Sequence, residues 1–199
     1  MNFDPFNDPP LFVGVDIAYS RDTLAVAAVC RHPESKGYCL WGHRIWKPEP
    51  KKGIQIQINK TIVPMLRWLL ENKRVAQILF DPYQFKSEAQ RMAEDGYGRV
   101  LREVNQQSES VLFTNTLHDH IENGTFFAYN DAELRSHFSW AAGKQTERGW
   151  RLVKLKQARP IDGVVATAMA LMGATVDLGH TKLPSYREEK HSPSLLGMP

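Results

Sequence analysis

The stretch Leu11-Phe12-Val13-Gly14-Val15-Asp16 decides the fold of this chain. Its run of apolar residues without polar alternation predicts a strand over residues 11–18, buried on both faces at the centre of a sheet that helices cover. A carboxylate directly after such a run is costly to remove from water, so it rarely lies there without a partner. Asp16 therefore makes the end of this strand a candidate site.

Two further aspartates lie next to apolar runs in the same way. Asp81 follows the run at residues 75–80, and Asp162 opens the run at residues 163–172. Three carboxylates that converge from separate elements repel one another unless a cation lies between them. Oxygen ligands of this kind suit Mg²⁺ or Mn²⁺, so the pattern predicts a metal-dependent phosphoryl-transfer site. The alternative for each aspartate taken alone is a turn residue or a helix N-cap.

Length and composition indicate one soluble globular domain. The chain has 199 residues, of which 42% are hydrophobic and 24% charged, which is enough to bury a core. We expect a flexible arm at residues 1–10, the domain at 11–178 and a disordered tail at 179–199. Because no apolar run reaches ~20 residues and the arm lacks the features of a signal peptide, we expect a cytoplasmic protein without a membrane partner.

Periodicity along the chain predicts an α/β fold. Three strands in a row, then alternating helices and strands, indicate a mixed sheet with helices on its faces, and such sheets place their sites at the carboxyl ends of parallel strands. Beyond the first strand, we expect strands at 24–31, 38–46, 75–80, 99–104 and 149–156, and helices at 54–72, 85–95, 108–123, 131–142 and from Pro160 onward.

Two features of this assignment remain open. Pro64 is awkward inside a helix over residues 54–72, because proline lacks an N–H and clashes with the preceding turn. Cys30 and Cys39, which are the two cysteines of the chain, face each other if their strands form a hairpin. We expect reduced thiols in a cytosolic protein, and a zinc site has no support.

Basic residues gather ahead of Asp162. The net charge of +3 permits nucleic-acid binding without demonstrating it. The cluster, however, is dense: Lys144, Arg148, Arg151, Lys154, Lys156 and Arg159. We expect Lys144, Arg148, Arg151, Lys154 and Arg159 to contact backbone phosphates, in binding that is insensitive to sequence and sensitive to salt. The alternative is an ordinary solvated basic face.

Several stretches together resemble one protein family. GVDIAYSRDTLAVAAV (14–29), LFDPYQF (79–85), ELRSHFSWAAGK (133–144) and RPIDGVVATAMALMGA (159–174), in this order and spacing, resemble the nuclease domain of the large terminase subunit of tailed bacteriophages. The resemblance covers roughly residues 11–176. It implies an RNase H-like fold, which is a mixed central β-sheet flanked by α-helices on both faces.

The resemblance also implies a function and its residues. The family's activity is endonucleolytic hydrolysis of double-stranded DNA with little sequence specificity, which cuts concatemeric genomes during packaging. By motif match, Asp16, Asp81 and Asp162 would be the catalytic, metal-binding acids. Lys156 aligns with the basic residue before the last acid, and Asp22 matches an additional acid behind the metal ligands or at a second metal site.

Partners and location follow from the same resemblance. They are double-stranded DNA, a packaging ATPase domain, the small terminase and the portal, in the cytosol of a bacterial host, with the gene carried by a phage or prophage. No GxxxxGK[ST] loop occurs in the 199 residues, so this chain would be an excised or stand-alone nuclease that does not translocate DNA by itself.

The acids suggest a mechanism with two Mg²⁺ or Mn²⁺ ions about 3.5–4 Å apart, one for the attacking water and one for the leaving 3′ oxygen. Asp16, central in the sheet, would bridge both ions, with Asp81 on one and Asp162 on the other. The ammonium of Lys156 would stabilise the scissile phosphate or hold the water, unless it is simply a solvated lysine.

Other classes compete with this interpretation. A resolvase or transposase of the same fold would use similar acids. Actin-like sugar kinases also begin with a GVDI-type strand, but they need glycine-rich phosphate loops and about twice this length. A third alternative is a non-catalytic DNA-binding or motor-docking module that has kept the fold.

Overall fold

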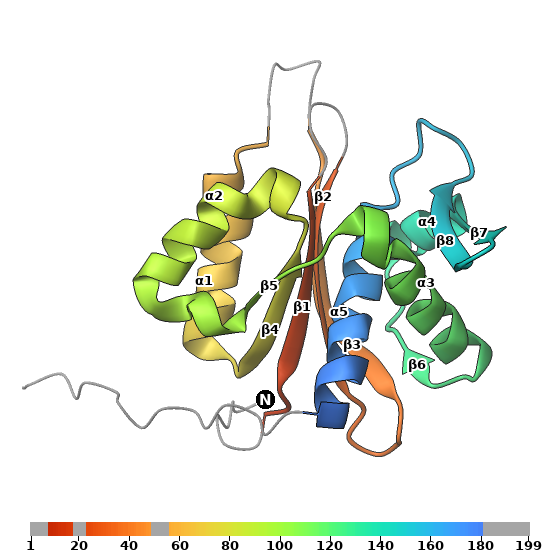
Figure 1. The fold of residues 1–199 in the computed structure, drawn as a ribbon, viewed down its shortest axis with the longest axis horizontal. Coiled ribbons are helices and arrows are strands. Elements are labelled where there is room, and N and C mark those ends of the chain that lie inside the picture. Colours follow the sequence, from red (N-terminus) through yellow and green to blue (C-terminus); the bar gives the residue numbers. More distant parts are fainter. Residues whose placement is uncertain (1–7, 18–22, 49–55, 181–199) are drawn as a thin grey trace, which may run out of the picture.

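The structure is a computed structural model that describes residues 8–17, 23–48 and 56–180. A six-stranded mixed β-sheet forms the centre, and helices cover both of its faces (Figure 1). The α/β class and the two-sided arrangement expected from the sequence are therefore confirmed. None of the helices in the described ranges combines the length and apolar character that a membrane span requires.

The central sheet has the strand order β5-β4-β1-β2-β3-β6. Strands β1, β2 and β3 form an antiparallel meander, whereas β4 is parallel to β1, β5 to β4 and β6 to β3. An antiparallel pair, β7 and β8, forms a separate small sheet. The strands are β1 (Leu11–Ile17), β2 (Leu24–Arg31), β3 (Tyr38–Trp46), β4 (Val75–Phe80), β5 (Leu101–Glu103), β6 (Phe126–Phe127), β7 (Ala141–Thr146) and β8 (Gly149–Lys154).

The helices divide between the two faces (Figure 1). Helices α1 (Ile62–Asn72) and α2 (Pro82–Met92) pack on one face, in a core with Leu11, Val13 and Val15 of β1. Helices α3 (Gln106–Glu122), α4 (Ala132–Trp140) and α5 (Asp162–His180) cover the other face. The shorter helical turns are η2 (Ile58–Lys60), η3 (Ala93–Tyr97) and η4 (Gly98–Val100).

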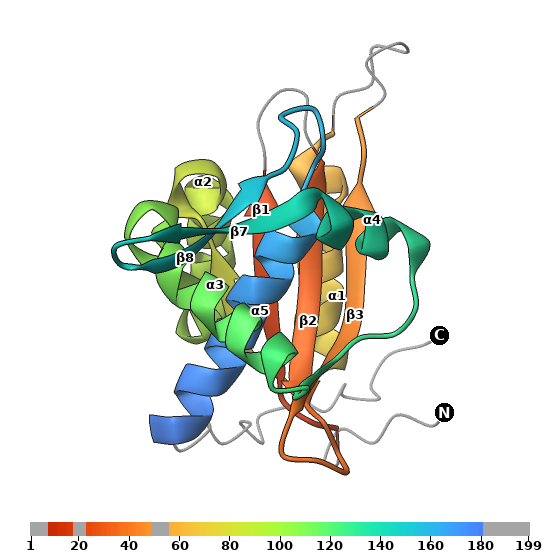
Figure 2. The ribbon, with the colours of Figure 1, turned by 90° about the vertical axis from the view of Figure 1, so that its right-hand side faces the viewer.

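Helix α5 is the central element of the second face. It lies across β1 and β2, and α3 and α4 pack over it (Figure 2). Residues 161–174 form an apolar run in the sequence and are buried on almost every side. This burial is expected of a helix held between a sheet and other helices. Gly14 permits this packing, because a Cβ there would run into the backbone carbonyl of Ala166.

The strands expected at 24–31, 38–46 and 75–80 are confirmed residue for residue. The helix expected at 54–72 is shorter, because α1 begins at Ile62 after the turn η2. Pro64 explains the difference. In the first helical turn its missing N–H leaves no hydrogen bond unmade, whereas a helix that began earlier would place the ring against the carbonyl of Lys60. Residues 54 and 55 lie outside the described residues.

The helix expected at 131–142 was wrong at its C-terminus. Asp131 is the N-cap, as predicted, but α4 ends at Trp140 and the chain continues directly into β7. Pairing with β8 gives the backbone of Ala141, Ala142 and Gly143 hydrogen-bond partners. At the end of a longer helix, these residues would have left backbone groups without partners. The expected arm and tail fall largely in residues 1–7 and 181–199, outside the described residues.

Substitution of Gly14 is expected to be among the most damaging single changes in the sheet. In Gly14→Ala the new methyl group meets backbone atoms of Ala166 and Ala170, which no side-chain rotation relieves, so we expect a loss of about 3 kcal/mol or more in the free energy of unfolding. Gly42→Ala in β3 is the matched control, because nothing lies within 4 Å of its Cβ position. Urea unfolding followed by circular dichroism measures both, and equal losses would contradict the packing described.

Candidate active site

Asp16 and Asp81 end neighbouring parallel strands at the same level. Val15 of β1 is in register with Phe80 of β4, and each aspartate is the next residue along the chain, Asp16 inside β1 and Asp81 just after β4. Side chains alternate between the faces of a sheet. Gly14 faces α5, so Asp16, two residues further, points to the same side. The carboxyl ends of β1 and β4 thus bring two of the predicted acids together below α5.

Asp162 joins them as the first residue of α5. It is 5% exposed and Asp16 is 7% exposed, so both carboxyl groups are buried. Burial raises the pKa of Asp16 to about 8, and the neighbouring charges of Asp162 and, less strongly, Asp81 act in the same direction. Asp162 and Asp81 therefore lie close enough to affect the ionisation of Asp16.

Two uncharged side chains hold the buried pair. The amide of Gln106, at the start of α3, donates a hydrogen bond from Nε2 to Oδ1 of Asp16 at 2.9 Å and lowers the pKa of that carboxyl group against the larger opposing effects. The hydroxyl of Thr23 donates to Oδ2 of Asp162. Neither residue was predicted from the sequence, because 90 and 139 residues separate the partners along the chain.

Asp81 has a second role, which the sequence left open. Its Oδ1 accepts the backbone N–H of Tyr83 at 2.9 Å, which makes Asp81 the N-cap of α2 with Pro82 in the first turn. Asp81 is therefore able to cap α2 and to take part in the site at the same time, because capping occupies only one of its two carboxylate oxygens. The helix expected at 85–95 begins earlier for this reason, at Pro82.

The three acids suit a metal ion by their chemistry, not by an arrangement already formed around one. Within the described ranges, no group of three or more His, Cys, Asp or Glu side chains is already arranged to hold an ion. The chemistry of the donor set nevertheless fits a hard cation, since two buried carboxyl groups and a third nearby offer only oxygen ligands. The mutual repulsion that contributes to the raised pKa of Asp16 is what a bound cation relieves.

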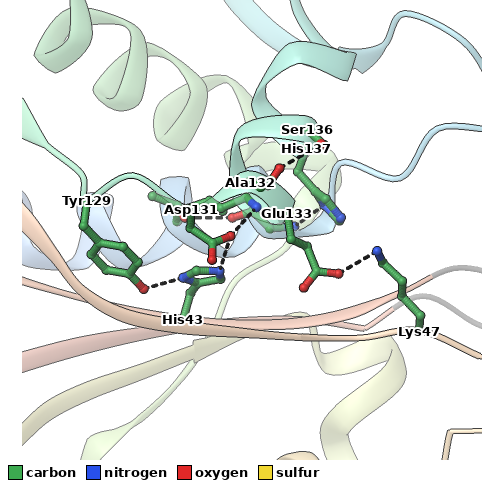
Figure 3. A network of polar contacts seen from close by, with 11 residues as sticks. His43, Lys47, Tyr129, Asp131, Ala132, Glu133, Ser136 and His137 are labelled. Carbon is green, nitrogen blue, oxygen red and sulfur yellow. Dashed lines mark hydrogen bonds and ion pairs between the residues drawn. The ribbon is translucent and has the colours of Figure 1, made fainter.

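Helix α4 fixes the start of α5 from the other side (Figure 3). His137, fully buried, accepts the backbone N–H of Gly163 on Nδ1 at 3.1 Å. Burial lowers the pKa of His137 to about 4, so its ring is neutral near pH 7 and able to accept. The bond satisfies one of the unpaired N–H groups at the helix end, directly beside Asp162.

Polar contacts tie α4 to β3 in turn (Figure 3). His43 forms a hydrogen bond with the hydroxyl of Tyr129 through Nδ1, and its Nε2 lies 3.4 Å from Oδ1 of Asp131. The ammonium of Lys47 lies 2.7 Å from Oε1 of Glu133. The sheet edge, α4 and the first turn of α5 are thus connected, and this connection was not predicted from the sequence.

The predicted basic residues lie mostly on the β7–β8 hairpin. Lys144 and Arg151 are directly opposite each other in register and both exposed, and Arg148 is exposed near the turn. The hairpin is docked on α3, where Oδ1 of Asn115 accepts the N–H of Trp150 at 2.9 Å. Lys154 ends β8 and is half-buried.

The remaining predicted residues are less closely associated with the acids. Arg159 lies with its guanidinium 4.9 Å from the ring centre of Trp140. Lys156 is exposed after the end of β8 and, in the described part of the chain, makes no hydrogen bond or ion pair with the three acids. Asp22 lies outside the described residues.

A cavity of about 600 Å³ adjoins the acids. Its walls come from the first turn of α2, the first turns of α3, and β8, and they include Asp81, Gln106 and Arg151. A second groove of similar size, lined by Arg148 and Arg151, continues between α3 and the hairpin. Gln107 and Arg151 line both hollows, so Asp81 and the basic residues of the hairpin lie along neighbouring parts of the surface.

Comparison with known proteins gives no match at the level of sequence and clear matches at the level of structure. No protein-family model and no curated protein matches the sequence. The HK97 bacteriophage large terminase matches with a TM-score of 0.71 at 16% identity, over 84% of this chain and 40% of that one. The chain thus spans less than half of that large terminase.

Isolated nuclease domains match over most of both chains. The large terminase nuclease from thermophilic phage G20c with bound magnesium has a TM-score of 0.60 at 16% identity, covering 83% of this chain and 82% of that one. The large terminase nuclease domain of Thermus phage P74-26 has a TM-score of 0.59 at 16% identity, covering 81% and 78%.

The fold of the chain follows from these comparisons. The mixed sheet with helices on both faces is of the RNase H-like class. Within that class, the chain has the fold of the nuclease domain of phage large terminases. The resemblance drawn from the sequence is therefore confirmed in the fold.

Asp16→Asn is expected to stabilise the metal-free protein, increasingly so as the pH rises. The folded chain holds a proton on Asp16, with a pKa of about 8, that the unfolded chain releases near 3.8. The stability this group contributes is therefore fully present below about pH 4 and is lost as the pH rises to about 8. At pH 9 we expect a Tm higher by at least the ~2–4 °C that 1 kcal/mol produces in a domain of this size.

Thermal unfolding in EDTA between pH 5 and 9 measures this difference, which should narrow toward pH 5. Asp119→Asn on the exposed surface of α3 is the control and should show no such trend. Excess Mg²⁺ at pH 8 should stabilise the wild type and Asp119→Asn but not Asp16→Asn, because a ligand that binds the folded state raises its Tm. A variant no more stable than wild type at pH 9 would show that Asp16 is not crowded by the other acids.

Proposed function

We propose that this domain is a metal-dependent endonuclease that hydrolyses phosphodiester bonds of double-stranded DNA with little sequence specificity. The observation that carries the proposal is the buried carboxyl pair of Asp16 and Asp162 close to Asp81, which lines a cavity together with Arg151. Acids crowded together in a buried place favour a cation, and a basic wall beside them favours a polyanion.

Asp16, Asp81 and Asp162 are the proposed ligands of one or two divalent ions. Mg²⁺ or Mn²⁺ bound there would supply an activated water and neutralise charge on the leaving 3′ oxygen. The G20c nuclease has the same fold as this chain, and its structures with bound magnesium and with bound cobalt support the choice of a divalent ion. Asp22 remains a proposed additional acid.

The other residues of the site orient these ligands. Gln106 keeps one oxygen of Asp16 in a fixed hydrogen bond, Thr23 does the same for Asp162, and His137 fixes the helix end that carries it. Such bonds hold ligating carboxylates in place and tune their basicity. Lys156 is a proposed contact to the scissile phosphate, which requires the exposed turn after β8 to move toward the acids.

DNA is proposed to lie along the β7–β8 hairpin. Lys144 and Arg151 face each other across the two strands, an arrangement of like charges that destabilises a hairpin unless an anion lies beside it. Together with Arg148, Lys154 and Arg159 they would contact phosphates, which position the duplex and carry no sequence information.

The biological setting follows from the same likeness and is part of the proposal. We infer a role in cutting concatemeric phage DNA during genome packaging, in the cytosol of the bacterial host. A packaging ATPase would position the DNA, and the small terminase and the portal would complete the assembly. This chain matches 40% of the HK97 large terminase. The rest of that protein is long enough to contain such an ATPase.

Purified domain is expected to nick and linearise unrelated plasmids with Mg²⁺ or Mn²⁺ and not with EDTA. Asp81→Asn should lower the rate by on the order of 100-fold or more, because it removes a ligand charge while an asparagine still caps α2. Asp131→Asn is the matched control, since Asp131 caps α4 in the same way through the N–H of Leu134. Gel assays of initial rates measure the effect.

Three outcomes separate the proposal from its competitors. Cutting that survives Asp81→Asn would exclude the site. Cutting confined to four-way junctions would indicate a resolvase-type enzyme. Salt-sensitive binding without cutting in either metal would indicate a non-catalytic DNA-binding or docking module.

The basic residues of the β7–β8 hairpin predict how DNA binding depends on salt. Replacing Lys144 and Arg148 together by alanine should weaken binding to every duplex sequence alike and reduce the slope of log K against log salt by about 0.9 for each lost phosphate contact. The control replaces Lys36 and Lys60, which are exposed on other elements. Fluorescence anisotropy in EDTA measures the slopes, and equal slopes for the two double variants would contradict the placement of DNA on the hairpin.

A further inference from the structure

The cavity beside the acids has a feature that hydrolysis of a phosphate does not require. Ser110 on α3 lines it and is only 7% exposed, yet its hydroxyl has no hydrogen-bond partner among the described residues. Serine in a helix can bond back to the carbonyl four residues earlier, as Thr114 does to Ser110 at 2.6 Å. An unpaired buried hydroxyl is unfavourable. Its oxygen is closed to solvent in the ligand-free chain, so a ligand that enters the cavity and reaches it would supply the missing hydrogen bond.

The floor of the same cavity is apolar and its rim carries an aromatic ring. Phe113 and Val165 line it and are buried. Tyr83 also lines it and is 86% exposed, which is unusual for so large a ring. The backbone N–H of Tyr83 is bound by Asp81, so the position of this residue is fixed relative to the acids.

These features together describe the ligand. It has a flat face for Tyr83, an apolar body for the floor, and a polar edge for Ser110. Gln107 and Arg151, also on the lining, add an amide that both donates and accepts and a cation suited to a phosphate. A nucleotide whose base is not paired meets all these requirements, whereas a base inside a duplex has its polar edge engaged and its faces covered by its neighbours.

We propose that this cavity binds one unpaired nucleotide of the DNA next to the acids, with Tyr83 stacked on the base and Ser110 hydrogen-bonded to its edge. The proposal rests on the function proposed above and adds a preference to it. DNA that is frayed, mismatched or gapped near the point of cutting binds better than an intact duplex. The donors and acceptors of a hydroxyl and an amide suit any base, so the preference is for unpaired structure and not for sequence.

Binding is tested without cutting, in EDTA, on two duplexes of one sequence that contain a single 2-aminopurine. In one the probe base is paired, and in the other it lies in a three-base mismatch. We expect the wild type to quench the fluorescence of the mismatched probe and to bind that duplex about 10-fold more tightly. Tyr83→Ala should weaken binding of the mismatched duplex by about 5- to 10-fold, at the low end of the range for loss of one aromatic stack, and leave the paired duplex unchanged.

Three further variants make the result specific. Tyr83→Phe should retain the preference, because the ring and not the hydroxyl makes the stack. Trp68→Ala removes an aromatic side chain that is 50% exposed on α1 and should change neither affinity. Ser110→Ala should weaken binding of the mismatched duplex about 2- to 10-fold with no loss of thermal stability, since it removes a hydroxyl without a partner.

Equal affinity for the two duplexes, or wild-type binding by both Tyr83→Ala and Ser110→Ala, would overturn the inference. Plasmid cutting with Mg²⁺ is scored on the same preparations. Cutting without any mismatch preference leaves the nuclease and removes the nucleotide site. If the wild type prefers the mismatched duplex, Tyr83→Ala abolishes that preference, and no plasmid is cut, the result supports the nucleotide site and excludes the nuclease.

Discussion

The close approach of α5 to β1 is the constraint on which the rest of the molecule depends. Gly14 lacks the side chain that would separate the helix backbone from the strand, and the small and flexible residues of α5 then fill the space up to the sheet. This packing contributes much of the core on one face. It also fixes where the helix begins, and its first residue, Asp162, is thereby held next to Asp16 at the end of the strand.

Two buried carboxyl groups side by side lower the free energy of unfolding, and several hydrogen bonds around them each offset part of that loss. Gln106 and Thr23 each donate one hydrogen bond to the pair, and His137 accepts an N–H at the end of α5. Because burial remains the larger effect, the pKa of Asp16 stays near 8. The arrangement is thus tolerated in the metal-free chain but better suited to one that holds a cation, which connects the packing of α5 directly to the proposed chemistry.

The sequence predicted the parts of this arrangement that local pattern encodes. Buried strands are continuous apolar runs, so β2, β3 and β4 could be located to the residue. The acids Asp16, Asp81 and Asp162 were found beside the apolar runs that form β1, β4 and α5. The start of α1 and the end of α4 were misplaced because competing partners decide them: the ring of Pro64 in one case, and pairing with β8 in the other. Cys30 and Cys39 do face each other across β2 and β3, with their sulfur atoms 3.4 Å apart as free thiols.

The partners of the acids could not be predicted in this way. Gln106 and Thr23 look like ordinary polar residues at element ends, and their meaning depends on which distant aspartate the fold brings to them. The same holds for Ser110, whose lack of a hydrogen bond is visible only in the packed structure. The buried acids and the unpaired hydroxyl of Ser110 each cost stability, and they lie at or near one cavity where α2, α3, α5 and β8 meet. Unfavourable features spread at random over a fold would indicate poor packing, whereas their concentration beside three carboxylates and an arginine indicates a site kept for a ligand. This argument depends on the chain's own residues, and it supports a function independently of the likeness in fold.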